Sequence, residues 1–217
     1  MNAVEVCRVS KSFGHHTVLQ AISLSIPEGQ IYGIVGRNGS GKTVLMKCIL
    51  GFMRPDLGEI AVWGKRIGID CSFAPQTGMI IETPGFLENE TGAANLRYLL
   101  RLKAQGKAMT PHQAMTMVGL DPSLKKPVSH YSLGMRQRLG IAQAIMEHPS
   151  LLILDEPMNG LDNRGMENIR SLLLSLREQG TTILLASHNP LDIEILCDEV
   201  YEMDQGKIMK INTHIAR

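Results

Sequence analysis

The chain has 217 residues, 44% hydrophobic and 20% charged, as expected of one globular domain or of one domain with an insertion. Its net charge of +1, from 22 basic and 21 acidic residues, and its 4% of aromatic residues argue against nucleic acid as a partner. The four cysteines form no CxxC pair, and no apolar run approaches the roughly 18 residues of a membrane span. The charged N-terminus does not resemble a signal peptide.

The first third of the chain predicts strands that lead into a glycine-rich loop. Residues 4–9 and 19–26 alternate between apolar and polar side chains, as strands do, and a turn follows at 27–30. Residues 31–35 are continuously apolar, which is typical of a strand covered on both faces. We expect a helix over about 44–50, directly after the loop at 36–43.

The last third repeats the pattern of buried strands. Residues 151–155 and 181–187 are apolar runs, and between them 164–180 has helical spacing and ends in Gly180. Strand, helix and strand in this order predict a parallel α/β sheet. Residues 199–211 predict a closing hairpin with its turn at 204–207.

The middle of the chain is mostly helical in pattern, from about Thr83 to Met146. Helical spacing covers 93–105, 111–120 and 133–146. We interpret this region as a helical insertion into the sheet domain, bounded by Pro84 and Pro149.

The loop GRNGSGKT matches G-x-x-x-x-G-K-[ST] and has a predicted strand before it and a predicted helix after it. Its glycines let backbone N–H groups face a polyphosphate, Lys42 reaches the β and γ oxygens, and Thr43 holds Mg²⁺. A plain glycine-rich turn is the alternative, and the strand–loop–helix context favours a nucleoside triphosphate site. The loop residues are Gly36, Arg37, Asn38, Gly39, Ser40, Gly41, Lys42 and Thr43.

Two carboxylates end the predicted strand at 151–155, in LLILDEP. Asp155 suits a Mg²⁺ ligand, directly or through water, and Glu156 can orient or deprotonate an attacking water. A solvated acidic turn is the alternative. His188 follows the next predicted strand, so it reaches the same sheet edge and is a candidate γ-phosphate contact.

These motifs together resemble the ATP-binding subunit of an ABC transporter. The P-loop, YSLGM followed by RQR, LLILDEPMNGLD and ASH occur in this order and spacing, and the likeness runs from about residue 2 to 211. It implies a P-loop NTPase fold of the ABC ATPase type, with a parallel core sheet, an N-terminal antiparallel β region and a helical insertion. The whole chain, 1–217, would then be one domain, with an ATPase core at 1–83 and 148–217 and a helical subdomain at 84–147.

The resemblance also implies partners. In the family two ATP-binding subunits meet head to tail, and each signature motif closes on the ATP held by the other P-loop. Ser132 and Gly134 would then contact the partner's γ-phosphate, and Asp162 would shape the joint between the two sites. Phe13 matches the aromatic residue that stacks on adenine, although a plain core role is the alternative. ATP and Mg²⁺ are the implied ligands.

The sequence departs from the family pattern at two places. Leu133 replaces the first signature glycine and Met135 alters its polar end, while Gly134 remains. Most members carry a Gln in the loop between sheet and helices, where it touches Mg²⁺ or the attacking water and senses the membrane partner. This Gln has a Gly four residues before it and a Thr nine after it. Gly78 and Thr91 bracket Glu82 in this way, and not Gln76. We therefore assign the role to Glu82, beside the metal, and a carboxylate there resembles exporters linked to bacitracin and lantibiotic resistance.

The resulting prediction is an ATPase that powers a membrane exporter, peripheral on the cytoplasmic face of the membrane. Its partners would be a permease and a second ATP-binding subunit, identical or paralogous. One alternative is an ABC-type ATPase without a transport role, although no coiled-coil arm or basic surface is evident. Another is a small-molecule kinase, which would leave the signature motif and His188 without a function.

Overall fold

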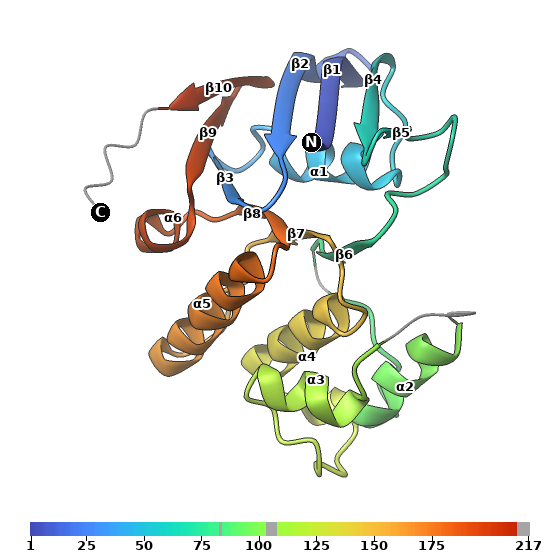
Figure 1. The fold of residues 1–217 in the computed structure, drawn as a ribbon, viewed down its shortest axis with the longest axis vertical. Helices are drawn as coiled ribbons and strands as arrows, with labels where there is room; N and C mark the ends of the chain where they lie inside the picture. Colours follow the sequence, from blue (N-terminus) through green and yellow to red (C-terminus); the bar gives the residue numbers. More distant parts are fainter. Residues whose placement is uncertain (83, 103–107, 212–217) are drawn as a thin grey trace.

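The computed structural model describes residues 1–82, 84–102 and 108–211. An antiparallel sheet lies at one end of the molecule and a group of helices at the other, with a larger sheet between them (Figure 1). The antiparallel sheet has the strand order β2-β1-β4-β5. Its strands are β1 (Asn2–Phe13), β2 (His16–Pro27), β4 (Leu57–Val62) and β5 (Lys65–Arg66).

The larger sheet has six strands in the order β10-β9-β3-β8-β7-β6. Neighbours pair in parallel except β9 and β10, which form the predicted closing hairpin. The predicted parallel α/β sheet is therefore confirmed. Its strands are β3 (Ile31–Val35), β6 (Thr77–Ile80), β7 (Leu151–Asp155), β8 (Thr182–Ala186), β9 (Glu199–Asp204) and β10 (Lys207–Ile211).

Helices cover both faces of this sheet. Helix α1 (Lys42–Leu50) packs between the two sheets, whereas α5 (Asn163–Glu178) and α6 (Pro190–Leu196) lie on the opposite face. Between β6 and β7 the chain forms α2 (Gly92–Leu102), α3 (Pro111–Met117), the short 3₁₀ turn η1 (Val128–His130) and α4 (Leu133–Ile145).

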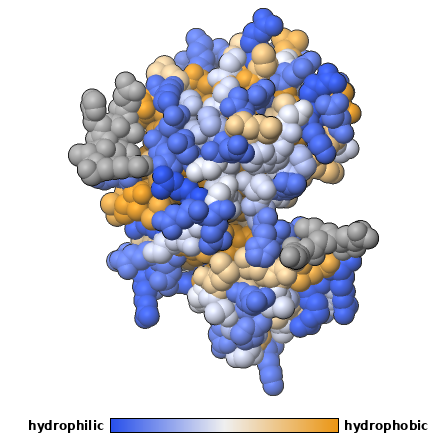
Figure 2. Space-filling view, viewed as in Figure 1, coloured by the Kyte–Doolittle hydropathy of each residue, from blue (hydrophilic) through white to orange (hydrophobic). Residues whose placement is uncertain are grey.

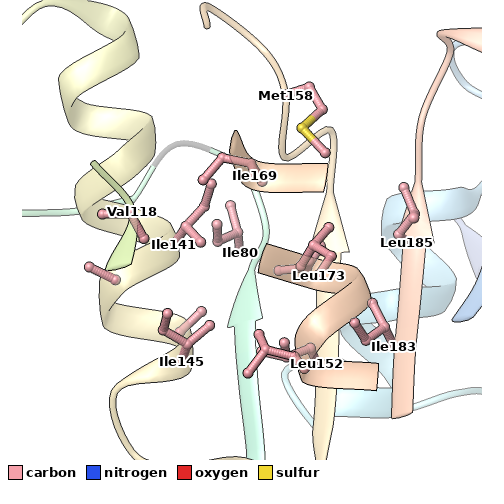
Figure 3. Packing of buried hydrophobic residues seen from close by; sticks show 14 of the residues in the cluster. Ile80, Val118, Ile141, Ile145, Leu152, Met158, Ile169, Leu173, Ile183 and Leu185 are labelled. Carbon is pink, nitrogen blue, oxygen red and sulfur yellow. The ribbon is translucent and has the colours of Figure 1, made fainter. Parts of the chain in front are cut away.

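Strand β7 shows how the core is divided. Because successive side chains of a strand point to opposite faces, Leu151 and Ile153 join the cluster around α1, while Leu152 and Leu154 join the cluster that contains α4 and α5. In the second cluster, Ile141 and Ile145 of α4 meet Ile80, Leu152 and the α5 residues Ile169 and Leu173 (Figure 3). This packing fixes α4 against the edge of the sheet.

The sequence missed several short elements. β4, β6 and α6 were not predicted, and α1 begins at Lys42, two residues before the expected start. Thr83, where the expected insertion begins, and residues 103–105 at the end of one expected helix lie outside the described residues. Within the described ranges, no helix is both long and apolar enough to cross a membrane. Apolar surface gathers over α6, where Leu191 and Ile195 are exposed (Figure 2).

Candidate active site

The candidate site lies along the carboxyl edge of the six-stranded sheet. Strands β3, β8 and β7 are parallel neighbours, so the segments that follow them emerge at the same edge. These segments are the P-loop after Val35, the acidic pair that ends β7, and His188 after β8. The structure thus brings together three groups of predicted residues that are far apart in the chain.

The P-loop has the backbone of an anion cradle. Gly36, Gly39 and Gly41 have positive φ angles of 148°, 81° and 107°. A Cβ at Gly36 would collide with the carbonyl oxygen of Met203, whereas the space at Gly39 is open. Helix α1 begins after Gly41 without a side-chain cap, which leaves the N–H groups of its first turn for a ligand.

Lys42 and Ser40 fit a polyphosphate at this loop. The Lys42 side chain is buried, and its Nζ donates to the carbonyl oxygens of Gly36 and Arg37, 2.6 Å and 3.1 Å away. Among the described residues it has no carboxylate partner, so its charge is available to an anion. The buried Ser40 Oγ also lacks a hydrogen-bond partner in the described part of the chain.

Thr43 and Asp155 form an oxygen donor set suited to Mg²⁺. Thr43 Oγ1 donates to Asp155 Oδ2 across 2.6 Å, joining the first turn of α1 to the end of β7. Hydroxyl and carboxylate oxygens are the ligands that Mg²⁺ prefers, together with waters and substrate phosphates. Among the described residues, no group of three or more His, Cys, Asp and Glu side chains could hold a metal ion.

Glu156 and His188 form a hydrogen-bonded pair next to this donor set. Glu156 has a left-handed backbone (φ 51°), and its N–H donates to the Ala186 carbonyl at 2.9 Å. Its Oε2 lies 2.8 Å from His188 Nδ1. The side chains are 25% and 69% exposed respectively, so water reaches the pair. A non-glycine residue held at positive φ beside a cavity is the kind of local strain found at functional sites.

The structure separates the two candidates for the loop after β6. Glu82 follows β6 and lines a cavity of about 710 Å³ together with Thr43, Asp155 and Glu156. Gln76 precedes β6, at the opposite edge of the sheet, and its Oε1 accepts a hydrogen bond from Ser150 Oγ at 3.0 Å. The role of Glu82 stays a prediction, but its position beside the metal donors is a feature of the fold.

The signature residues lie at the start of α4. Ser132 is exposed and caps the helix, because its Oγ accepts from the Met135 N–H at 3.2 Å. A Cβ at Gly134 would lie 2.7 Å from the Gly160 carbonyl oxygen, so glycine permits a close approach of α4 to this turn. Leu133 packs against Gly160 but remains 64% exposed.

Two other predicted residues have partners of their own. Asp162 caps α5, accepting from the Gly165 N–H at 3.0 Å, and lies 3.4 Å from Arg138 Nη2. Phe13 is 48% exposed at the end of β1, and Lys11 Nζ lies 5.7 Å from its ring centroid. Among the described residues neither lines the cavity that contains Glu82.

Two residues near the site escaped the sequence analysis. Gln137 is buried on α4, and its Nε2 donates to the carbonyl oxygens of Glu156 and Pro157 at 3.3 Å and 2.9 Å. Lys47 lies one helical turn after Thr43, and its Nζ is 2.6 Å from Glu82 Oε1. The helical spacing from Thr43 could have indicated Lys47; nothing in the sequence indicates the two carbonyls that Gln137 meets.

Arg136, which also lines this cavity, forms a further ion pair. Its guanidinium binds both oxygens of Glu88, at 2.6 Å and 2.8 Å, and this pairing lowers the pKa of the Glu88 carboxyl. Glu88 lies in the segment between β6 and α2. The pair therefore ties the start of α4 to that segment.

Comparison with known proteins identifies the class. The family model described as ABC transporter matches residues 19–159. The bacitracin transport ATP-binding protein BcrA of Enterococcus faecalis is 43% identical over 209 residues, which cover 95% of this chain and 68% of that protein. The lantibiotic transport ATP-binding protein SrtF of Streptococcus pyogenes is 34% identical over 210 residues, which cover 95% of this chain and 89% of that protein.

A solved structure agrees with these relatives. The ATP-binding subunit of an ABC transporter superposes with a TM-score of 0.86 at 27% identity, over 97% of this chain and 90% of that one. The chain therefore belongs to the ABC transporter family. It is an ATP-binding and ATP-hydrolysing subunit of the kind that powers membrane transport, and the predicted fold class is confirmed.

Proposed function

We propose that this chain is the motor subunit of an exporter for peptide antibiotics, bound to a permease on the cytoplasmic face of the membrane. The names of two relatives, a bacitracin and a lantibiotic transport protein, support the substrate class. The observation that carries the proposal is Glu82, a carboxylate beside the metal donors, in the position that resembles this exporter type.

The P-loop residues 36–43 bind the triphosphate, with backbone N–H groups and Lys42 on its oxygens. Thr43 and Asp155 would hold Mg²⁺, and the bound ion would offset the charge of the phosphate oxygens. Phe13 stacks on the adenine. For this role the Phe13 ring, which is exposed beside Lys11, would have to contact the face of the adenine ring.

Glu156 is the general base for hydrolysis. Its carboxylate takes a proton from a water molecule whose oxygen attacks the γ-phosphorus, and the bond from that phosphorus to the β–γ bridging oxygen breaks. ADP and inorganic phosphate leave. His188 holds the carboxylate in position through its 2.8 Å contact with Oε2 and reaches the γ-phosphate from the same side.

A second ATP-binding subunit, identical or paralogous, completes each site. Ser132 and Gly134 at the start of α4 contact the γ-phosphate held by the partner, and Asp162 shapes the joint between the sites. The exposure of Ser132 and Leu133 supports this role, since an exposed helix start offers N–H groups to an external anion. Residues 84–147 act as the helical subdomain that carries this surface, on a core of 1–83 and 148–217.

Reconstitution with a permease that co-purifies with this chain tests the proposal. We expect bacitracin or a lantibiotic to stimulate phosphate release by the reconstituted complex, and to be moved out of the compartment that holds ATP. Glu156→Gln should abolish both signals while ATP binding persists. Phosphate release that is indifferent to both the permease and the peptides would overturn the exporter assignment and favour an ATPase without a transport role.

A further inference from the structure

Lys47 and Glu82 join two segments that meet at the metal donors. Lys47 is on α1, one turn beyond Thr43, so both residues lie on the same face of that helix. Glu82 follows β6, the edge strand next to β7 (Figure 1). Lys47 Nζ lies 2.6 Å from Glu82 Oε1, with side-chain exposures of 27% and 64%.

Folding stability does not account for this pair. Ion pairs this exposed contribute little to the free energy of unfolding, because water screens the charges and ordering the side chains costs entropy. The location of the pair is more informative. Glu82 lines one cavity with Asp155 and Glu156, so three carboxylates face the same space. Lys42, also on that cavity, is committed to the P-loop carbonyls and to the phosphate.

A carboxylate at this position brings an extra negative charge beside a site that must bind a polyanion. Lys47 cancels that charge locally and holds only one of the two oxygens. Glu82 Oε2 has no hydrogen-bond partner within the described ranges, so it remains a free acceptor for a metal-bound water. The pair thus offers one oriented oxygen atom, while the net charge of the pair as a whole is near zero.

We propose that Lys47 is the positioning residue of Glu82: it fixes the carboxylate at the metal site and balances its charge. This inference rests on the proposed role of Glu82. Loss of Lys47 would leave the carboxylate charged but free to rotate. The uncompensated charge strengthens binding of a divalent cation, and the lost orientation slows turnover.

A double-mutant cycle tests the inference. The variants are Lys47→Gln, Glu82→Gln and both together, with Lys47→Arg as the conservative replacement. Lys210→Gln is the matched control, since it removes a lysine from another exposed pair, Lys210–Glu199 at 2.8 Å, on the β9–β10 hairpin. Mn²⁺ binding to the ATP-bound Glu156→Gln protein is followed by electron paramagnetic resonance, and kcat and KM are measured with Glu156 intact.

With Glu82 present, we expect Lys47→Gln to tighten Mn²⁺ binding about two- to fivefold and to lower kcat about three- to tenfold, with KM for ATP little changed. Lys47→Arg should restore both values, and Lys210→Gln should change neither. In the Glu82→Gln background, Lys47→Gln should leave kcat unchanged, because no carboxylate remains to be oriented, whereas loss of the lysine charge should still tighten Mn²⁺ binding.

An equal loss of kcat from Lys47→Gln in both backgrounds would overturn the inference while leaving the role of Glu82 intact. If Glu82→Gln by itself changes neither Mn²⁺ affinity nor turnover, the assignment of Glu82 fails and this inference fails with it. Melting temperatures of all variants should remain within the range of Lys210→Gln, because the pair is exposed.

Discussion

The carboxyl edge of the six-stranded sheet and the start of α4 differ in how their polar groups are satisfied. At the edge, groups from separate segments of the chain pair with one another: Thr43 with Asp155, and Glu156 with His188. At the start of α4, Ser132 bonds only within its own helix among the residues that the structure describes, and Leu133 is exposed. Under the proposed function, one copy of the chain would assemble the hydrolytic groups, whereas the exposed signature turn would gain its ligand from another subunit.

The largest expected effect is at the carboxyl edge. Glu156→Gln removes the proton acceptor but keeps the shape of the side chain, so we expect kcat for ATP hydrolysis to fall about 10²- to 10⁴-fold. Phosphate release under single-turnover conditions measures the loss, with ATP binding as the control for folding. Turnover close to that of the unmodified chain would show that Glu156 is not the base.

The next effect concerns the support beneath His188. Asp192 is fully buried and accepts hydrogen bonds from Arg170 and from Ser187, which precedes His188. Asp192→Ala leaves the Arg170 charge buried and unpaired, so we expect the free energy of unfolding to fall by about 3–5 kcal/mol. Urea denaturation measures the change.

The exposed pair Arg66–Asp70 supplies the control for that measurement. Asp70→Ala should lower the free energy of unfolding far less than Asp192→Ala does, because both side chains of the Arg66–Asp70 pair are solvated. Equal losses for Asp70→Ala and Asp192→Ala would mean that burial of the Arg170–Asp192 pair does not matter for folding.

A smaller effect on the free energy of unfolding is expected at Gln137, which connects α4 to the carboxyl edge of the six-stranded sheet. Gln137→Leu deprives the carbonyls of Glu156 and Pro157 of their side-chain donor, and should lower the free energy of unfolding by about 1–3 kcal/mol. Gln143→Leu is a control on the same helix: its buried Oε1 has no partner among the described residues, so its replacement should cost little or nothing. Urea denaturation of both variants measures the difference. If Gln143→Leu lowers the free energy of unfolding as much as Gln137→Leu does, the hydrogen bonds of Gln137 do not stabilise the protein.

The sequence predicted the elements that carry an unbroken apolar run or a recognisable motif. The apolar runs of β3, β7 and β8 and the P-loop between β3 and α1 are local signals, and their order defines the parallel sheet. β6 and α6 span only 77–80 and 190–196, too short for periodicity to separate them from loops.

Contacts between distant segments were beyond the sequence. Spacing selected Glu82 over Gln76, and the fold brings only Glu82 to the metal donors. Lys47, 35 positions earlier in the chain, could not be linked to Glu82 without the packing of α1 beside β6. The sequence analysis included Gln137 only as part of the RQR motif and assigned it no contact. Its carbonyl partners are 19 and 20 positions away in the chain.

The need for a second subunit is tested most directly by the mass of the Glu156→Gln protein in Mg-ATP. Asp and Asn cap helices as well as Ser does, so Ser132→Asp and Ser132→Asn both keep α4 intact, but only Asp places a negative charge against a partner's phosphate. Light scattering on the chain and on its complex with the permease should show nucleotide-dependent pairing for Glu156→Gln. The added Ser132→Asn should preserve the pairing and the added Ser132→Asp should abolish it, with ATP still bound. Pairing that survives Ser132→Asp, or a protein that stays monomeric in both preparations, would contradict the account.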